Sequence, residues 1–171
     1  MIRLLTGSTH TGKTLLAQRL LERHGAPYLS IDHLKMGLIR SGMCPLTPES
    51  PDEALTAVLW PVVREIVKTA VENGQTLTVE GCYIPFDWRE DFDASYLPHI
   101  RFLCLVFSEA YIRTRFDAIR AHANAIERRK DDSFCTMESL LAENRRNLEV
   151  CRRRGLPYSL IDGPYAPPLD W

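Results

Sequence analysis

Short apolar runs alternate along this chain with longer segments in which apolar residues recur at helical spacing. The strand-like runs lie at about Ile2–Thr6, Tyr28–Ile31, Thr76–Glu80, Ile100–Phe107 and Tyr158–Ile161. The helical patterns lie at about Gly12–His24, His33–Ser41, Pro51–Asn73, Glu109–Arg128 and Thr136–Arg154. Such alternation is typical of a parallel sheet covered by helices. We therefore expect an α/β fold of three layers, with a doubly wound, five-stranded parallel sheet flanked by helices.

The residues between these segments agree with that pattern. Four glycines stand just after predicted helices, where a left-handed C-terminal cap is commonly needed: Gly25, Gly42, Gly74 and Gly155. Only Met43–Pro51, which is rich in Pro and Ser, and Trp88–His99 are expected to be irregular connections. No repeat, low-complexity tract or linker interrupts the chain, so we expect one domain over residues 1–171.

Composition narrows the class of protein. With 171 residues, 45% of them hydrophobic and 25% charged, the chain can bury a sizeable core. The formal net charge of −1 argues against a dedicated nucleic-acid binder, which is usually clearly basic. The five cysteines are widely spaced without a CxxC pair, so neither a disulfide framework nor a zinc site is predicted. The N-terminus enters a strand at once and no apolar run could span a bilayer, so we expect a cytoplasmic protein without a membrane partner.

The strongest functional signal follows the first predicted strand. The phosphate-loop pattern GxxxxGK[ST] is matched by Gly7-Ser8-Thr9-His10-Thr11-Gly12-Lys13-Thr14. Glycines let the backbone curl so that successive N–H groups face a polyphosphate, and the positive end of the next helix adds to the same site. Lys13 is expected to reach the β and γ oxygens of ATP, and the Thr14 hydroxyl to bind Mg²⁺. We therefore expect ATP and Mg²⁺ as cofactors, bound by this loop.

Carboxylates stand at the ends of two further predicted strands. In an open parallel sheet the ligand lies beyond the carboxyl ends of the strands, which here carry Asp32, Glu80-Gly81, Ser108-Glu109 and Asp162-Gly163. Glu80 is either the second Mg²⁺ carboxylate, acting directly or through a bound water, or a helix-capping or surface glutamate. Asp32 is either the N-cap of the next helix or a residue that orients or deprotonates an attacking hydroxyl.

Arginines are concentrated in the last third of the chain. Most belong to a solvated face, but arginines that close over a transferred phosphoryl group supply planar, multidentate donors and exclude water. The segment between two predicted helices, about residues 121–133, carries Arg128, Arg129 and Lys130. We expect this segment to be a short lid.

Several of these residues resemble the adenylate kinase-like P-loop kinases of nucleoside monophosphates and small molecules. Beyond the loop, Val79-Glu80-Gly81 resembles the strand-three Asp-Gly step of that family, Arg129-Lys130-Asp131-Asp132 its lid, and Ile161-Asp162-Gly163 the step into its adenine-contacting loop. The resemblance implies that Gly163 and Arg115 lie beside the adenine, and that Arg120 and Arg129 clamp phosphate as catalytic residues. A further lid arginine would be Arg145 or Arg146.

The acceptor side departs from true adenylate kinases. That family holds the phosphate of AMP with an arginine after strand two and another after strand three, where this chain has Lys35-Met36 and Gly81-Cys82-Tyr83-Ile84-Pro85. A monophosphate acceptor therefore loses its main anchors. Asp32 instead resembles the acceptor-side aspartate of relatives that phosphorylate an alcohol, such as kinases of shikimate, gluconate or certain antibiotics.

These observations predict a phosphotransferase that moves the γ-phosphate of Mg-ATP to a hydroxyl of a small molecule, with Lys13, Asp32, Arg120 and Arg129 as catalytic residues. The acceptor pocket is expected to draw on Tyr83, Phe86, Trp88, Arg89, Met36 or Arg40. Three alternatives stay open. They are a nucleotide kinase anchored by Arg40 or Arg89, a polynucleotide 5′-hydroxyl kinase, and a nucleotide-binding module or slow ATPase without an acceptor.

Overall fold

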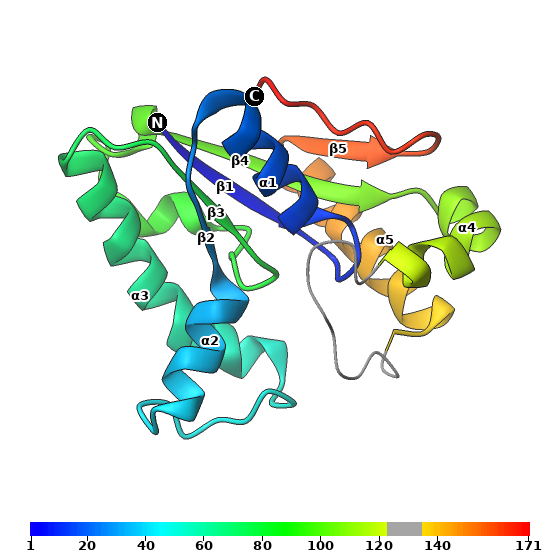
Figure 1. Cartoon of the computed structure of the whole chain (residues 1–171), viewed down its shortest axis with the longest axis horizontal. Coiled ribbons are helices and arrows are strands. Elements are labelled where there is room, and N and C mark those ends of the chain that lie inside the picture. The colour runs from blue at the N-terminus through cyan, green and yellow to red at the C-terminus, as the bar shows by residue number, and fades with distance from the viewer. Residues whose placement is uncertain (123–134) are drawn as a thin grey trace.

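A five-stranded, all-parallel sheet forms the centre of the molecule (Figure 1). The computed structural model describes residues 1–122 and 135–171. The strands are β1 (Ile2–Gly7), β2 (Tyr28–Ser30), β3 (Leu77–Glu80), β4 (Ile100–Phe107) and β5 (Tyr158–Ile161). Their spatial order is β2-β3-β1-β4-β5, so the chain runs outward from β1 first to one edge and then to the other. The predicted doubly wound parallel sheet is confirmed.

Helices connect the strands. They are α1 (Lys13–His24), α2 (Ile31–Arg40), α3 (Asp52–Glu72), α4 (Glu109–Ala121) and α5 (Met137–Arg154). All four glycines that follow predicted helices have positive φ, as a left-handed cap requires. No helix in the described part of the chain is both long and apolar enough to cross a membrane.

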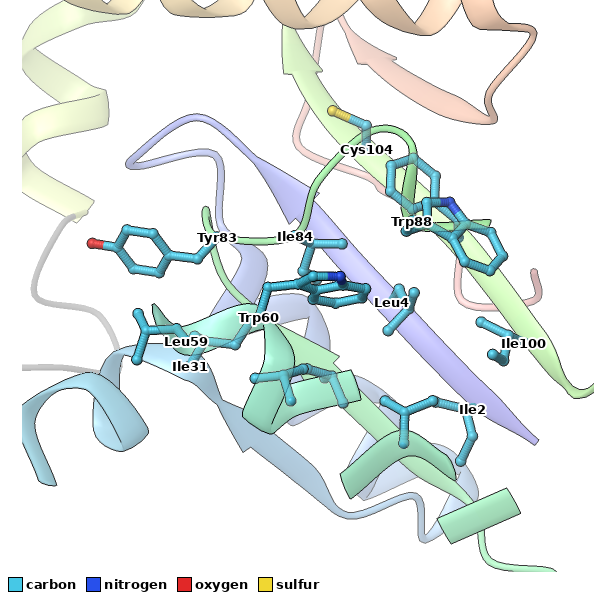
Figure 2. Close-up of a cluster of buried hydrophobic side chains, with 14 of the residues drawn as sticks. Ile2, Leu4, Ile31, Leu59, Trp60, Tyr83, Ile84, Trp88, Ile100 and Cys104 are labelled. Atoms are coloured by element: carbon cyan, nitrogen blue, oxygen red, sulfur yellow. The ribbon is translucent and has the colours of Figure 1, made fainter. Parts of the chain in front are cut away.

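The strands bury alternate residues on opposite faces of the sheet. Along β4, Phe102, Cys104 and Val106 belong to one core cluster, whereas Leu103 and Leu105 belong to another. The first cluster is covered by α3, by part of α5 and by the segment after β3 (Figure 2). The second is covered by α1 and the C-terminal segment. This period of two, with both faces apolar, is the expected signature of a parallel strand between two helical layers.

Most predicted element bounds agree with the structure to within one residue, and the second helix, the connection after the third strand and the fourth helix require comment. The second helix begins at Ile31 rather than His33, so Asp32 lies inside its first turn. The connection over Trp88–His99 contains two short 3₁₀ helices, η1 (Trp88–Asp91) and η2 (Leu97–His99). The helix predicted to reach Arg128 is described up to Ala121, with His122 as its C-cap. Its predicted continuation and the lid beyond residue 122, Arg129 included, lie outside the described residues.

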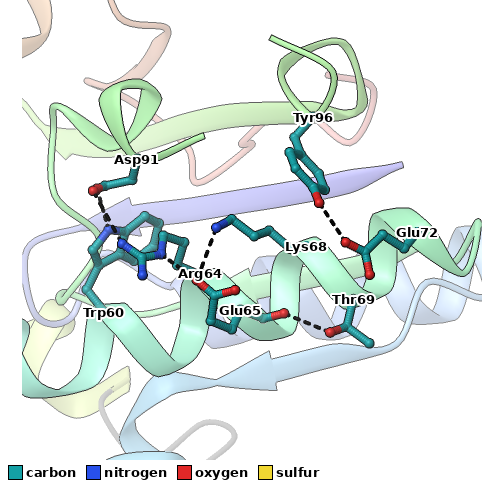
Figure 3. A network of polar contacts seen from close by, with 8 residues as sticks. All are labelled: Trp60, Arg64, Glu65, Lys68, Thr69, Glu72, Asp91 and Tyr96. Carbon is teal, nitrogen blue, oxygen red and sulfur yellow. Dashed lines mark hydrogen bonds and ion pairs between the residues drawn. The ribbon is translucent and has the colours of Figure 1, made fainter. Parts of the chain in front are cut away.

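Polar contacts fasten the η1–η2 segment to α3 (Figure 3). The indole Nε1 of Trp60 donates to Asp91 at 2.7 Å, and the Tyr96 hydroxyl donates to Glu72 at 2.6 Å. Arg64 adds an ion pair to Asp91 at 3.7 Å. Residues 81–87 join β3 to the η1–η2 segment. Because both ends of this connection are held, these contacts fix its position.

Candidate active site

A cavity of about 1770 Å³ opens beyond the carboxyl ends of the strands. Its walls come from the β1–α1 loop, α2, the segment 48–53 before and into α3, the end of β3, and parts of α4 and α5. Segment 162–165, after β5, closes one end. The cavity therefore lies where an open parallel sheet binds its ligands.

The β1–α1 loop has the backbone that its sequence predicts. Gly7 has φ of 145°, and a Cβ there would lie 2.4 Å from the Leu105 carbonyl oxygen, so only glycine fits. His10 and Gly12 have left-handed φ values of 64° and 79°. Alternation of right- and left-handed residues turns successive N–H groups toward one point, which makes an anion-binding concavity. Helix α1 starts at Lys13, so its N-terminal end also faces this point.

Lys13 is folded back onto the loop. Its Nζ donates to the carbonyl oxygens of Ser8 at 2.9 Å and Gly7 at 3.2 Å, and the side chain is buried. Burial by itself lowers the pKa of Lys13, but nearby Cys82, Glu80 and Asp32 together outweigh it and raise the pKa above its ordinary value. Lys13 is therefore a protonated cation at neutral pH.

Glu80 lies beside Thr14. It ends β3, pairs in register with Leu5 of β1, and is 2% exposed, so the alternative of a surface glutamate is wrong. The Thr14 hydroxyl donates to its Oε1 at 3.4 Å. A hydroxyl and a carboxylate facing one phosphate loop are the oxygen donors that Mg²⁺ prefers, so these two residues fit that ion.

Two side chains that the sequence did not single out support the loop. On α5, the amide of Asn147 donates to the Ser8 hydroxyl at 3.1 Å, and both side chains are buried. After β5, the Tyr165 hydroxyl lies 2.8 Å from the carbonyl oxygen of Gly12 and 3.2 Å from that of Thr11, and donates to them. The burial of Asn147 had a signal in the sequence, because Asn147 lies at helical spacing from Leu140 and Cys151 on the buried face of α5. Tyr165 had none beyond its place after a strand.

Asp32 is held at the cavity wall by Lys35. The N-cap of α2 is Ser30, so the alternative of Asp32 as N-cap is wrong. The Asp32 carboxylate lies 2.7 Å from Lys35 Nζ and remains 42% exposed, while the lysine is 12% exposed. Lys35 also donates to the Tyr83 hydroxyl at 2.9 Å. A charged chain from α2 to the β3 turn thus fixes the direction of Asp32.

Around this contact the pKa shifts favour a charged Lys35, a neutral Tyr83 hydroxyl and a neutral Cys82 thiol. Burial lowers the pKa of Lys35, but its hydrogen bonds to Asp32 and Tyr83 more than compensate and raise it above its ordinary value. Burial raises the pKa of the Tyr83 hydroxyl and of the Cys82 thiol. Cys82 donates to the Gly7 carbonyl oxygen at 3.4 Å as a neutral thiol between the loop and Asp32.

The predicted arginines divide between the cavity and the surface. Arg115, where α4 departs from helical φ and ψ, and Arg146 on α5 both line the cavity. Arg145 instead contacts Glu109 at 3.4 Å, so Arg146 is the member of that pair on the cavity side. Arg120 lies over the Phe116 ring at 6.0 Å and is not among the described residues of the cavity wall.

The predicted acceptor residues divide in the same way. Met36, Arg40, Tyr83 and Phe86 line the cavity. Trp88 is buried in the core, and Arg89 covers its ring at 5.4 Å, so within the described chain neither reaches the cavity wall. At the opposite end Gly163 lines the cavity, next to Asp162, which accepts a hydrogen bond from Ser108.

Glu143 on α5 is a further wall residue that the sequence did not indicate. Burial raises the pKa of its carboxyl group, and the negative charge of Asp52 raises it further. A hydrogen bond from the backbone of Thr9, in the phosphate loop, opposes this. Carboxylates of α3 and α5 therefore belong to the wall of the same cavity.

Comparison with solved structures shows a kinase fold. A gluconokinase from Sinorhizobium meliloti 1021 matches over 98% of this chain and 83% of its own, with 21% identity and a TM-score of 0.52. Shikimate kinase from Bacteroides thetaiotaomicron matches over 95% of this chain and 86% of its own, with 13% identity and a TM-score of 0.52. At these identities the likeness shows the fold alone, an α/β fold with a parallel sheet that this chain shares with both kinases, and the adenylate kinase-like resemblance stays a prediction.

Comparisons at the level of sequence are negative. No family model matches this chain, and no curated protein matches it. The assignment of chemistry therefore depends on the residues of the cavity.

Proposed function

We propose that this protein transfers the γ-phosphoryl group of Mg-ATP to a hydroxyl group of a small molecule. The observation that carries the proposal is that one cavity contains both the phosphate loop with Lys13 and the exposed carboxylate of Asp32. The loop supplies what a polyphosphate requires, and Asp32 supplies an acceptor for a hydroxyl proton. The likeness in fold to kinases is consistent with this chemistry.

Each residue has a role in the proposed reaction. Lys13 and the loop N–H groups bind the phosphates, and Thr14 with Glu80 would hold Mg²⁺, which would neutralise charge on the phosphate oxygens. The acceptor oxygen forms a bond to the γ-phosphorus as the bond to the bridging oxygen of ADP breaks. Asp32 orients the hydroxyl and takes its proton. Positioning and charge stabilisation supply most of the rate enhancement.

Arginines complete the proposed site. Arg115 is expected to lie beside the adenine with Gly163, at the end of the cavity opposite α2. Arg146 faces the cavity from α5 and is suited to stabilise charge on the transferred group. The phosphate-clamping roles of Arg120 and Arg129 stay predictions, because Arg120 does not line the described cavity wall and Arg129 lies outside the described residues.

A monophosphate acceptor is less well supported. Of the two arginines that could anchor it, Arg89 packs on Trp88, and only Arg40 lines the described cavity wall. Arg40 lies in the last turn of α2, and the first turn of the same helix carries Asp32, whose charge repels an anion. Phosphate recognition usually uses several convergent, multidentate donors.

The experiment is acceptor-stimulated release of ADP from Mg-ATP by the purified protein. The panel contains nucleoside monophosphates, nucleosides, sugars, sugar acids and aminocyclitols, with Lys13→Met as the inactive control. Stimulation by a hydroxyl compound, with formation of its phosphate ester, supports the proposal. Stimulation by a monophosphate contradicts it, and ATP binding without stimulation by any compound favours a nucleotide-binding module.

A further inference from the structure

The acceptor half of the cavity carries an excess of negative charge. We define this half by the segment from α2 to the first turn of α3, residues 32–53. Among its described wall residues, the acidic side chains are Asp32, Glu49, Asp52 and Glu53, and the cationic ones are Lys35 and Arg40. The rest of the wall carries the cations Lys13, Arg19, Arg115 and Arg146 against the carboxylates Glu80, Glu143 and Asp162, so its balance is slightly positive. Charge is therefore divided between the two ends of one cavity.

Lys35 is committed to the protein itself. Its ammonium group bonds both the Asp32 carboxylate at 2.7 Å and the Tyr83 hydroxyl at 2.9 Å, with 12% of the side chain exposed. Because the charge of Lys35 is already matched by Asp32, an anionic acceptor that approached the lysine would also meet that carboxylate. The acceptor half thus offers an anion one cation, Arg40, against three further carboxylates.

Asp52 acts on the inside of the cavity rather than only on its own helix. It lies in the first turn of α3 and lines the cavity, whose wall also includes Glu143 on α5. The charge of Asp52 contributes to the raised pKa of Glu143, in addition to burial. A cation located between Asp52 and Glu143 would relieve their mutual repulsion.

The arrangement suits an organic cation better than a metal ion. In the chain as far as it is described, no three residues of the types His, Cys, Asp and Glu come close enough to hold a metal ion. The acidic side chains are spread over a wall of a large cavity, so they match a charge carried on a molecule of sugar size.

We propose that the acceptor is an alcohol that also carries a protonated amine, and that Asp52 with Glu53 at the start of α3 selects it over neutral and anionic alcohols. This inference depends on the proposed function, because it names the class of the acceptor. The two structural neighbours reported above are named as kinases of gluconate and shikimate, which are alcohols that carry a carboxylate. The acceptor class proposed for this chain differs from both. Lys35 contributes to this selectivity by remaining paired with Asp32.

Acidic residues in a first turn also stabilise their helix through its dipole, so the test must separate this effect from recognition. Asp52→Asn removes a first-turn charge of α3 that lines the cavity. Glu138→Gln removes a first-turn charge of α5 that does not line it, and is the matched control. Thermal unfolding of both variants reports the effect on the helices alone.

The experiment compares matched pairs of acceptors, glucosamine with glucose and streptamine with scyllo-inositol, together with gluconate and shikimate. Phosphate-ester formation and binding to the complex with a non-hydrolysable ATP analogue are both measured. We expect lower KM and Kd for the amine of each pair. Asp52→Asn should raise these values about tenfold for amines and less than about twofold for neutral partners, while Glu138→Gln changes neither.

The amine preference should also weaken as ionic strength rises, since exposed charge pairs are screened. Equal phosphorylation of both members of a pair, or preference for gluconate or shikimate, overturns the inference and leaves the hydroxyl kinase intact. Absence of both ester formation and binding for every alcohol, with ATP bound, overturns the proposed function and the inference together.

Discussion

Asn147 on α5 donates a hydrogen bond at 3.1 Å to Ser8 in the phosphate loop, 139 positions away in the chain, and both side chains are buried. The contact joins the loop to a helix that packs on the opposite face of the sheet from α1. Asn144, one turn earlier, accepts from the backbone N–H of Phe107 at the end of β4. The two amides therefore fix α5 against both the sheet and the loop.

Asn147→Ala should destabilise the protein and loosen the phosphate loop. Removing the amide leaves the buried Ser8 hydroxyl without this partner, which costs about 1–3 kcal/mol. We expect a lower Tm and a several-fold weaker Kd for a non-hydrolysable ATP analogue. Gln18→Ala removes a partly exposed amide from α1 and is the control. An unchanged Kd for Asn147→Ala, with normal folding, would show that the contact has no role in shaping the loop.

Tyr165→Phe should weaken nucleotide binding with little loss of the fold. The Tyr165 hydroxyl donates to Gly12 and Thr11 where the loop enters α1, and a single hydrogen bond contributes about 0.5–1.5 kcal/mol. We expect Kd for the ATP analogue to rise by a factor between about 2 and 10, measured by calorimetry. Tyr158→Phe alters a more exposed hydroxyl on β5 and should bind as the parent does. Equal effects in both variants would argue against a specific role.

The sheet and the phosphate loop could be predicted because their signals are local. An apolar run, a glycine pattern and a helix start occupy adjacent positions, so Ile2–Thr14 specifies its own conformation. The supports of that loop could not be predicted in the same way. Asn147 and Tyr165 meet it only after the chain has folded, and nothing near either residue in the sequence indicates the partner.

On the acceptor side, too, local features could be predicted from the sequence and tertiary contacts could not. Asp32 could be identified because it follows a predicted strand. Its role depended on whether α2 starts before or after it, and periodicity does not place a helix start to within two residues. In the sequence, Lys35 marks only a position near which adenylate kinases have an arginine. Its bond to Tyr83, from the turn after β3, required the tertiary structure.

Glu80→Gln should raise the requirement for Mg²⁺. Glu80 contacts Thr14 from the end of β3, and loss of a carboxylate near a metal commonly weakens metal affinity by about 10- to 100-fold. We expect the Mg²⁺ concentration at half-maximal ADP release to rise at least tenfold. Binding of ATP without Mg²⁺ should not weaken, because a negative charge beside the phosphates is lost. An unchanged Mg²⁺ dependence, with Glu22→Gln as control, would remove Glu80 from the metal site.

Glu143→Gln should stabilise the protein at high pH but not at low pH. Burial raises the pKa of Glu143 in the folded state above its ordinary, unfolded value. Below the ordinary pKa both states are protonated and the residue contributes no difference, whereas above the raised pKa the folded state carries a disfavoured charge. Glutamine keeps an oxygen that can accept from Thr9 without that charge.

Thermal unfolding at pH 4 and pH 8 checks this sign. We expect Glu143→Gln to have a higher Tm than the parent at pH 8 and a nearly equal Tm at pH 4. Glu149→Gln, on the exposed part of the same helix, should show no such pH-dependent difference. A gain of equal size at both pH values would mean that packing rather than charge is responsible.

The central claim, that Asp32 acts on an acceptor hydroxyl in the cavity that binds ATP, is tested most directly by Asp32→Asn. The measurement is kcat for phosphate-ester formation on the best hydroxyl acceptor, alongside Kd for the ATP analogue, with Asp93→Asn as an exposed control. General-base groups contribute about 10²–10⁴ in rate, so we predict a fall in kcat of at least about 100-fold, with Kd for the ATP analogue changed less than about threefold. An unchanged kcat in Asp32→Asn would contradict the account.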